Sequence, residues 1–155
     1  MSASPVALVD TLNALLEAEQ SSLFRFMGEG YPYLNRATVE VRRPLQEMVA
    51  TIDERAARLA EQVEALGGVP KFGPRGIDRE EQYLSFLSLK FLLPKLVEAK
   101  NQMIERYENA LNSIRGNEDG ATDAKALLTA LLEEHTAQLK TLEEAAARVA
   151  SQKTP

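Results

Sequence analysis

The sequence predicts an all-α protein folded as one four-helix bundle, and three observations support this class. Apolar residues recur at spacings of three and four through four long segments, as on the buried face of a helix. The same periodicity indicates no strand. The length of 155 residues suits a single domain. Within one domain over residues 1–155, we expect helices at about 5–27, 38–66, 79–115 and 123–150.

The first helix is expected to begin at Ser4-Pro5, where a capping hydroxyl precedes a proline at the first helical position. It is expected to stop near residues 28–30, before an aromatic turn at residues 31–33. We interpret this turn as a packed bundle end rather than a binding edge. The buried stripe of the helix is apolar apart from one glutamate and consists of Leu8, Leu12, Leu16, Glu19, Leu23 and Phe26.

The second helix has a stripe with one basic residue, and arginine is rarely buried without a paired group. Pro44 either opens this helix or kinks it. Gly67 is the expected left-handed cap at its end. The stripe consists of Leu45, Met48, Ile52, Arg55, Leu59, Val63 and Leu66.

A long connection over residues 68–77 follows, with two prolines and three glycines. Ten extended residues reach roughly 33–36 Å, and a helix of about 25 residues is roughly 37 Å long. The connection can therefore run the length of a bundle. This predicts two helical hairpins joined by a long crossover rather than an up-down-up-down chain.

The third helix is expected to begin at Asp78 with Glu81 as capping-box partner, and to end at Arg115-Gly116. Pro94 should bend it. Asp123 is the expected N-cap of the fourth helix. The third stripe consists of Phe86, Leu89, Leu93, Leu96, Lys100, Met103, Tyr107, Leu111 and Ile114. The fourth consists of Leu128, Leu132, His135, Leu139, Leu142, Ala146 and Val149.

Each stripe carries one ionisable residue near its middle: Glu19, Arg55, Lys100 and His135. Four helices of similar length would bring these residues to one level. The sequence thus predicts a buried polar layer in an aliphatic core. The alternative, strongest for Lys100, is a side chain at the edge of its stripe that reaches water.

Three segments resemble the bacterioferritin and rubrerythrin group of the ferritin-like superfamily: LNALLEAEQSSLFRF, ARLAEQVEALGGVP and EEHTAQL. The resemblance implies a four-helix bundle with a long second connection. It also implies a centre of two iron or manganese ions, held by a glutamate from each of two helices and a Glu-x-x-His motif from each of the other two.

When this ligand pattern is placed on the chain, most ligand positions hold residues that cannot bind a metal ion. Glu19 keeps the first-helix glutamate, and His135 keeps the fourth-helix histidine. The other four ligand positions hold Ile52, Arg55, Lys100 and Leu132. Two divalent ions need several carboxylates, and two basic side chains would repel them. We therefore expect no bound metal, only a vestigial layer in which Glu19 pairs with basic groups.

A non-catalytic ferritin-like protein with a structural or protein-binding role is the leading functional hypothesis. The main alternative is a ferroxidase, iron-storage or oxidative-stress protein with iron or manganese at a rearranged site. That site would combine Glu19 and His135 with one further acid from Asp53, Glu54, Glu98, Glu105 and Glu108. A third hypothesis is a small apolar ligand held near Phe26, Tyr31, Tyr33 and Phe91.

Several function classes are excluded or disfavoured. Net charge is −5 without a long basic run, which argues against nucleic acid and anionic membranes. The chain has no cysteine and one histidine, and Glu133 and Glu134 beside that histidine are expected to face water. We find no nucleophilic triad and no phosphate loop, so no catalytic or cofactor-binding residue is expected, although enzyme status stays open.

The first residues lack a basic region typical of a signal peptide, and no apolar run is long enough to span a bilayer. A cytoplasmic protein is therefore expected. The family resemblance implies a homo-oligomer, at least a dimer.

Overall fold

The computed structural model describes residues 6–24, 39–72, 89–116 and 120–151, and it confirms the all-α class. The helices are α1 (Val6–Gln20), α3 (Val39–Ala65), α4 (Leu89–Ser113) and α5 (Ala121–Ser151). This part of the chain contains no strand. None of its helices combines the length and the apolar character that crossing a membrane requires.

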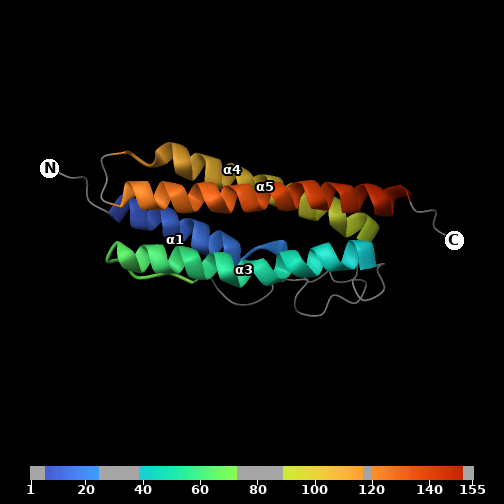
Figure 1. The fold of residues 1–155 in the computed structure, drawn as a ribbon, viewed down its shortest axis with the longest axis horizontal. Coiled ribbons are helices and arrows are strands. Elements are labelled where there is room, and N and C mark those ends of the chain that lie inside the picture. Colours follow the sequence, from blue (N-terminus) through green and yellow to red (C-terminus); the bar gives the residue numbers. More distant parts are fainter. Residues whose placement is uncertain (1–5, 25–38, 73–88, 117–119, 152–155) are drawn as a thin grey trace.

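The four helices lie side by side in one elongated bundle (Figure 1). Helix α1 packs mainly on α3, and α4 packs mainly on α5, while α3 also packs on α5. Figure 1 shows that α3 and α4 both run from right to left, so the end of α3 and the start of α4 lie at opposite ends of the bundle. The expected crossover covers residues 68–77, and its second half, from residue 73 on, lies outside the described residues. The expected start of the third helix at Asp78 also lies outside them.

Helix α1 is shorter than the helix predicted over residues 5–27. It ends at Gln20, and Ser21 and Ser22 are not helical. The Ser21 hydroxyl donates to the carbonyl of Glu17 at 3.0 Å, and the Ser22 hydroxyl accepts from the backbone N–H of Phe24 at 3.2 Å. Serine hydroxyls that bond to nearby backbone compete with helical hydrogen bonds, which explains the break.

Helix α3 ends as the sequence predicts, with Gly67 as its left-handed cap. Gly67 has a φ of +83°, and its N–H donates to the carbonyl of Glu64 at 2.9 Å. The N–H of Gly68 donates to the carbonyl of Val63 at 3.0 Å. This pair of bonds is the Schellman motif. Pro44 lies inside α3, so it does not open the helix.

The predicted ends of the third and fourth helices are shifted in the structure. Helix α4 ends at Ser113, and Gly116 is not a left-handed cap, since the glycine with positive φ at this end is Gly120, at +79°. Helix α5 begins at Ala121. Asp123 therefore lies in the first turn rather than at the N-cap, where its carboxylate still suits the positive end of the helix dipole.

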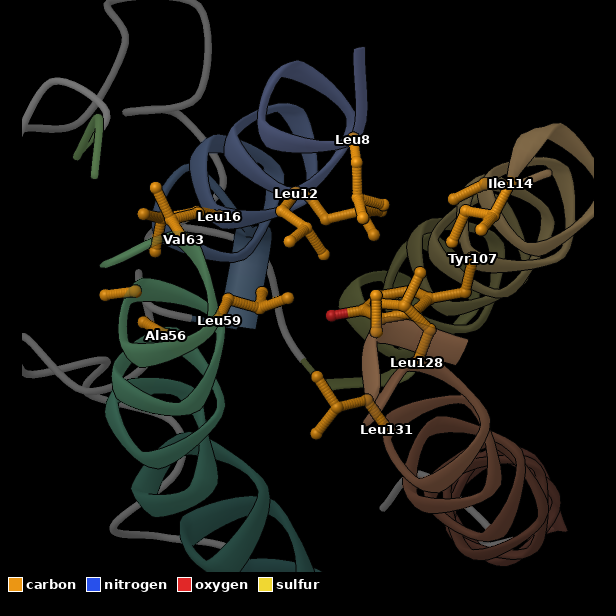
Figure 2. Close-up of a cluster of buried hydrophobic side chains, with 14 of the residues drawn as sticks. Leu8, Leu12, Leu16, Ala56, Leu59, Val63, Tyr107, Ile114, Leu128 and Leu131 are labelled. Atoms are coloured by element: carbon orange, nitrogen blue, oxygen red, sulfur yellow. The ribbon is translucent and has the colours of Figure 1, made fainter. Parts of the chain in front are cut away.

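The core consists of two apolar clusters, one toward each end of the bundle. Most of the first cluster is drawn in Figure 2. It is formed by Leu8, Leu12, Leu15, Leu16, Ala56, Leu59, Ala60, Val63, Met103, Tyr107, Ala110, Ile114, Ala121, Ala124, Leu128 and Leu131. The second cluster is formed by Phe24, Val41, Leu45, Met48, Ile52, Leu89, Leu92, Leu93, Leu96, Leu142 and Ala145. Along each helix, the predicted polar residue falls between the two clusters.

The stripe predicted for the fourth helix is partly wrong. Leu128, His135 and Leu142 are buried as expected, but Leu131 and Ala145 are buried with them. Four residues assigned to the stripe are only half-buried: Leu132, Leu139, Ala146 and Val149. The buried face of α5 is therefore rotated relative to the prediction.

Candidate functional site

The predicted polar layer forms in the structure, with one ionisable residue from each helix. The exposed fractions are 0% for Glu19, 1% for Arg55, 2% for Lys100 and 1% for His135. All four residues lie inside the bundle, so Lys100 does not reach water at the edge of its stripe. Such residues are almost never fully buried unless they are paired, and the hydrogen bonds around them supply that pairing.

Glu19 is the acceptor at the centre of the layer. The Nε of Arg55 lies 3.1 Å from both of its carboxylate oxygens. The Tyr107 hydroxyl donates to Oε1 at 2.8 Å, and Nε2 of His135 lies 2.6 Å from the same oxygen. Figure 2 shows the Tyr107 side chain reaching inward from α4 with its oxygen toward the middle of the bundle. Three helices thus aim donors at one carboxylate from α1.

The two ring nitrogens of His135 have different roles. An ionised carboxylate only accepts hydrogen bonds, so Nε2 of His135 carries the proton that faces Glu19. In the neutral ring, Nδ1 is then an acceptor, and the Nζ of Lys100 lies 3.1 Å from it. We assign this tautomer from the hydrogen-bond partners. Lys100 and Glu19 are thereby linked through the imidazole.

Two further side chains close these contacts into a ring. The Nζ of Lys100 donates to Oε1 of Gln138 at 2.8 Å, and Nε2 of Gln138 donates to the Thr51 hydroxyl at 3.0 Å. Arg55 donates to the same hydroxyl at 2.7 Å. The Thr51 hydroxyl donates its own proton to the carbonyl of Met48 at 2.7 Å. We call the resulting cycle the hydrogen-bond ring, which consists of Glu19, Arg55, Thr51, Gln138, Lys100 and His135.

The layer changes the protonation behaviour of its members. Burial raises the pKa of Glu19, but four other effects together lower it to about 2. These are the hydrogen bond from His135, the positive charge of that ring when it is protonated, the charge of Arg55 and the hydrogen bond from Tyr107. Burial is the largest cause that lowers the pKa of Lys100 to about 7, and the charge of Arg55 acts in the same direction. The charge of Glu19 opposes this shift. Burial also lowers the pKa of His135, although Glu19 opposes the shift.

Tyr107 stays protonated in this environment. Burial is the largest cause that raises its pKa well above the ordinary value, and the charge of Glu19 and the hydrogen bond to it act in the same direction. The phenol ring also lies beside the imidazole of His135, with centroids 5.1 Å apart. Tyr107 therefore serves as a neutral donor that helps keep Glu19 ionised.

The residues present do not fit a di-metal centre. Arg55 and Lys100 occupy the layer itself, Ile52 is buried in the second apolar cluster, and Leu132 is half-buried. Within the described ranges, no group of three or more histidines, cysteines or acids could hold a metal ion. The acids offered as an extra ligand are all exposed: Asp53, Glu54, Glu98, Glu105 and Glu108. A rearranged site on Glu19 and His135 therefore finds no third ligand among them.

Sequence reasoning missed part of the ring. Thr51 and Gln138 were not predicted, and Tyr107 was expected only as a core residue. A signal was available, because each lies on the same helical face as a predicted member. Thr51 precedes Arg55 by four residues, and Gln138 follows His135 by three.

Glu134 differs from the prediction that it points to water. It is half-buried, and its Oε2 lies 2.6 Å from Arg58. Its Oε1 lies 4.0 Å from the guanidinium of Arg55. The negative charge of Glu134 thus borders the layer on the α3–α5 side.

Three of the four residues of the predicted apolar ligand site lie outside the part of the chain that the structure describes. These are Phe26, Tyr31 and Tyr33. Phe91 is 63% exposed on α4, so its ring does not lie between helices.

Comparison of the chain with known protein families, curated proteins and solved structures finds no match. The ferritin-like resemblance therefore rests on the three segments quoted above. Functional inference depends on that resemblance and on the geometry of the layer.

Proposed function

We propose that this protein is a non-catalytic relative of the ferritin-like enzymes, in which a buried ion network replaces the di-metal centre. The observation that carries the proposal is the contact of Arg55 Nε with both oxygens of Glu19, 3.1 Å each, inside the bundle. The guanidinium engages the carboxylate that a metal ion would need. In this proposal the protein has no resident iron or manganese.

Charge supports the proposal. Glu19 and Arg55 neutralise each other, and Lys100 adds a second basic group to the same layer. Two divalent ions bring four positive charges and are bound with several carboxylate ligands. Within the layer described here, Glu19 is the one carboxylate that accepts from the ring. The layer therefore repels cations as well as lacking ligands for them.

The role that follows is structural or protein-binding. A buried polar network contributes little net stability, and its best-attested use is to fix how helices pair. The hydrogen-bond ring joins all four helices at one level, so it specifies their register. We place the protein in the cytoplasm and expect it to self-associate as at least a dimer, as the family resemblance implies. Sedimentation velocity tests the last point, and a monomer at every concentration would contradict it.

Metal analysis and a ferrous oxidation assay test the absence of a metal centre. The protein is purified from cells grown with added iron and manganese, and its metal content is measured before and after incubation with ferrous iron. We expect substoichiometric metal and no oxidation above buffer. Stoichiometric metal that disappears in both Glu19→Gln and His135→Gln would overturn the proposal and favour a metal-dependent oxidase or storage protein.

A further inference from the structure

The contact between Lys100 and His135 is compatible with a neutral imidazole but not with an imidazolium. The Nζ of Lys100 lies 3.1 Å from Nδ1 of His135, while Nε2 of the same ring faces Glu19 at 2.6 Å. A second ring proton would have to sit on Nδ1. It would then point at an ammonium group that has no acceptor to offer.

The charges around the imidazole make this conflict severe. Glu19 faces the ring from α1, Arg55 lies nearby on α3, and Lys100 and Tyr107 face it from α4. On α5 itself, Glu134 is directed to Arg58 and approaches Arg55 at 4.0 Å. An imidazolium would therefore place three cations around one buried carboxylate, Glu19.

Among the described residues, no carboxylate lies within ion-pair distance of Lys100, although the charge of Glu19 acts on it. Its other hydrogen-bond acceptor in the ring is the neutral amide of Gln138, at 2.8 Å. The Phe24 ring lies over Nζ at 4.3 Å to the centroid, and such a cation–π contact is weaker than a buried ion pair. At the level of the layer, separation of Lys100 from a charged His135 is opposed by these two contacts, while the apolar packing of α4 on α5 holds the helices together on either side.

We propose that the Lys100–His135 contact is an acid-operated latch between α4 and α5, which opens when a proton from solvent binds Nδ1 of His135. Lys100 keeps its three protons, and the hydrogen bond to Nδ1 is the bond that breaks. The imidazolium stays paired with Glu19 through Nε2. Opening separates the middle of α4 from α5 and admits water to the layer between the two apolar clusters. This inference rests on the proposed function in one respect, since a metal ion on Glu19 and His135 would replace the hydrogen bonds of the imidazole.

Protonation and opening are coupled through linkage. Burial lowers the pKa of His135 in the closed bundle. In the open state the imidazole is hydrated and still paired with Glu19, so its pKa is at least the ordinary value of about 6.5. Between the two pKa values, the open state therefore binds one proton more than the closed state. The opening equilibrium constant should rise about tenfold for each pH unit below 6.5 until the closed state also protonates.

His135 is the only histidine in the chain, so its imidazole signals can be followed without assignment ambiguity. We suggest uniform ¹⁵N labelling of the full chain in EDTA, with imidazole spectra and amide-exchange protection factors measured from pH 8 to pH 4.5. We expect the Nε2–H tautomer at neutral pH. Below pH 6.5, protection around Lys100 and His135 should fall about tenfold per pH unit.

Variants separate the latch from general acid sensitivity. His135→Gln keeps a donor for Glu19 and an acceptor for Lys100 but does not titrate, so protection should be flat from pH 6.5 to pH 4.5. Lys100→Met removes the opposing cation, so His135 should protonate at higher pH without loss of protection. Lys95→Met, at an exposed position of α4, is the matched control and should behave like the unmodified protein.

Three results would overturn the latch. One is an Nδ1–H tautomer at neutral pH, and another is protonation near pH 6.5 with unchanged protection. The third is an acid-dependent loss of protection that persists in His135→Gln. If Lys100→Met does not fold, the unmodified chain and His135→Gln still decide the question. The EDTA excludes metal release as the origin of the pH dependence.

Discussion

At the scale of single residues, Glu19 is a buried carboxylate whose charge depends on its donors. Arg55, Tyr107 and His135 all donate to it. Its fully buried position would otherwise favour the neutral acid. The first two tests therefore concern this residue and Lys100, because each carries charge inside the core.

Replacement of Glu19 by glutamine should destabilise the protein strongly. The amide keeps the shape of the side chain, but Arg55 loses its buried carboxylate partner and keeps only the half-buried Glu134 at 4.0 Å. Breaking a buried ion pair in this way costs roughly 3–5 kcal/mol. Urea unfolding at pH 7 followed by circular dichroism measures the change. Glu17→Gln, at an exposed position two residues earlier in α1, is the control, and equal stability of the two variants would contradict the account.

Lys100 should give the stability a pH dependence on the alkaline side of neutrality. Its pKa is about 7 in the folded state and ordinary, near 10.4, in the unfolded chain. Above pH 7 the unfolded state therefore binds the extra proton. The free energy of unfolding should rise with pH, by up to about 1.4 kcal/mol per unit between pH 7 and pH 9.5.

Lys100→Met should remove this slope, whereas Lys95→Met should retain it. Urea unfolding of the three proteins at several pH values provides the comparison. A flat profile in the unmodified protein would show that Lys100 remains charged in the fold.

At the scale of elements, the ends of the helices are set by specific backbone and side-chain bonds. Helix α1 stops one residue after Glu19, and the break at Ser21 and Ser22 precedes Phe24, which covers Lys100. Helix α3 stops in a left-handed turn at Gly67.

Gly67→Ala should destabilise the protein by about 1–2 kcal/mol. The φ of +83° forces a Cβ into contact with the neighbouring carbonyl oxygen, although no other atom lies within 4 Å of the added carbon. Gly116→Ala is the matched control, since Gly116 has open space around it and its φ is not positive. Thermal unfolding measures both. A smaller effect at Gly67 than at Gly116 would argue against the cap.

The helix interiors were easier to predict from the sequence than their ends. Apolar periodicity placed the stripe of α3 correctly from Leu45 to Val63, because polar residues fill its other face. On α5, leucines occupy both Leu127–Leu128 and Leu131–Leu132, so periodicity alone does not define the buried side. Serine hydroxyls that end α1 leave no mark in apolar periodicity, which is why that helix was predicted too long.

At the scale of the whole molecule, two apolar clusters enclose a polar level that all four helices share. The ionisable members of that level were predictable because each interrupts an apolar stripe. Thr51 and Gln138 carry only a weak signal, their helical spacing from Arg55 and His135. Uncharged polar residues are common at the edge of a stripe, and their role depends on the exact rotation of α3 and α5. The pairing of helices around Glu19 likewise required the three-dimensional arrangement.

The assembled layer should make the whole bundle sensitive to acid. Glu19 has a folded pKa of about 2, below its ordinary value, so the unfolded chain binds the proton first as the pH falls. The contribution of the Glu19 carboxylate to the free energy of unfolding is complete above about pH 4.5. It falls by roughly 3 kcal/mol in total as the pH decreases from 4.5 to 2. Urea unfolding across this range tests the claim. The Glu19→Gln variant should lose less stability over the same interval, and an identical loss would assign the effect to other carboxylates.

The most direct test of the ion network is a crystal structure of protein grown with iron and manganese, with anomalous diffraction recorded at both metal edges. We expect no anomalous peak between the four helices and clear density for Arg55 paired with Glu19. An anomalous peak within ligand distance of Glu19 and His135, with Arg55 and Lys100 turned away, would contradict the central claim.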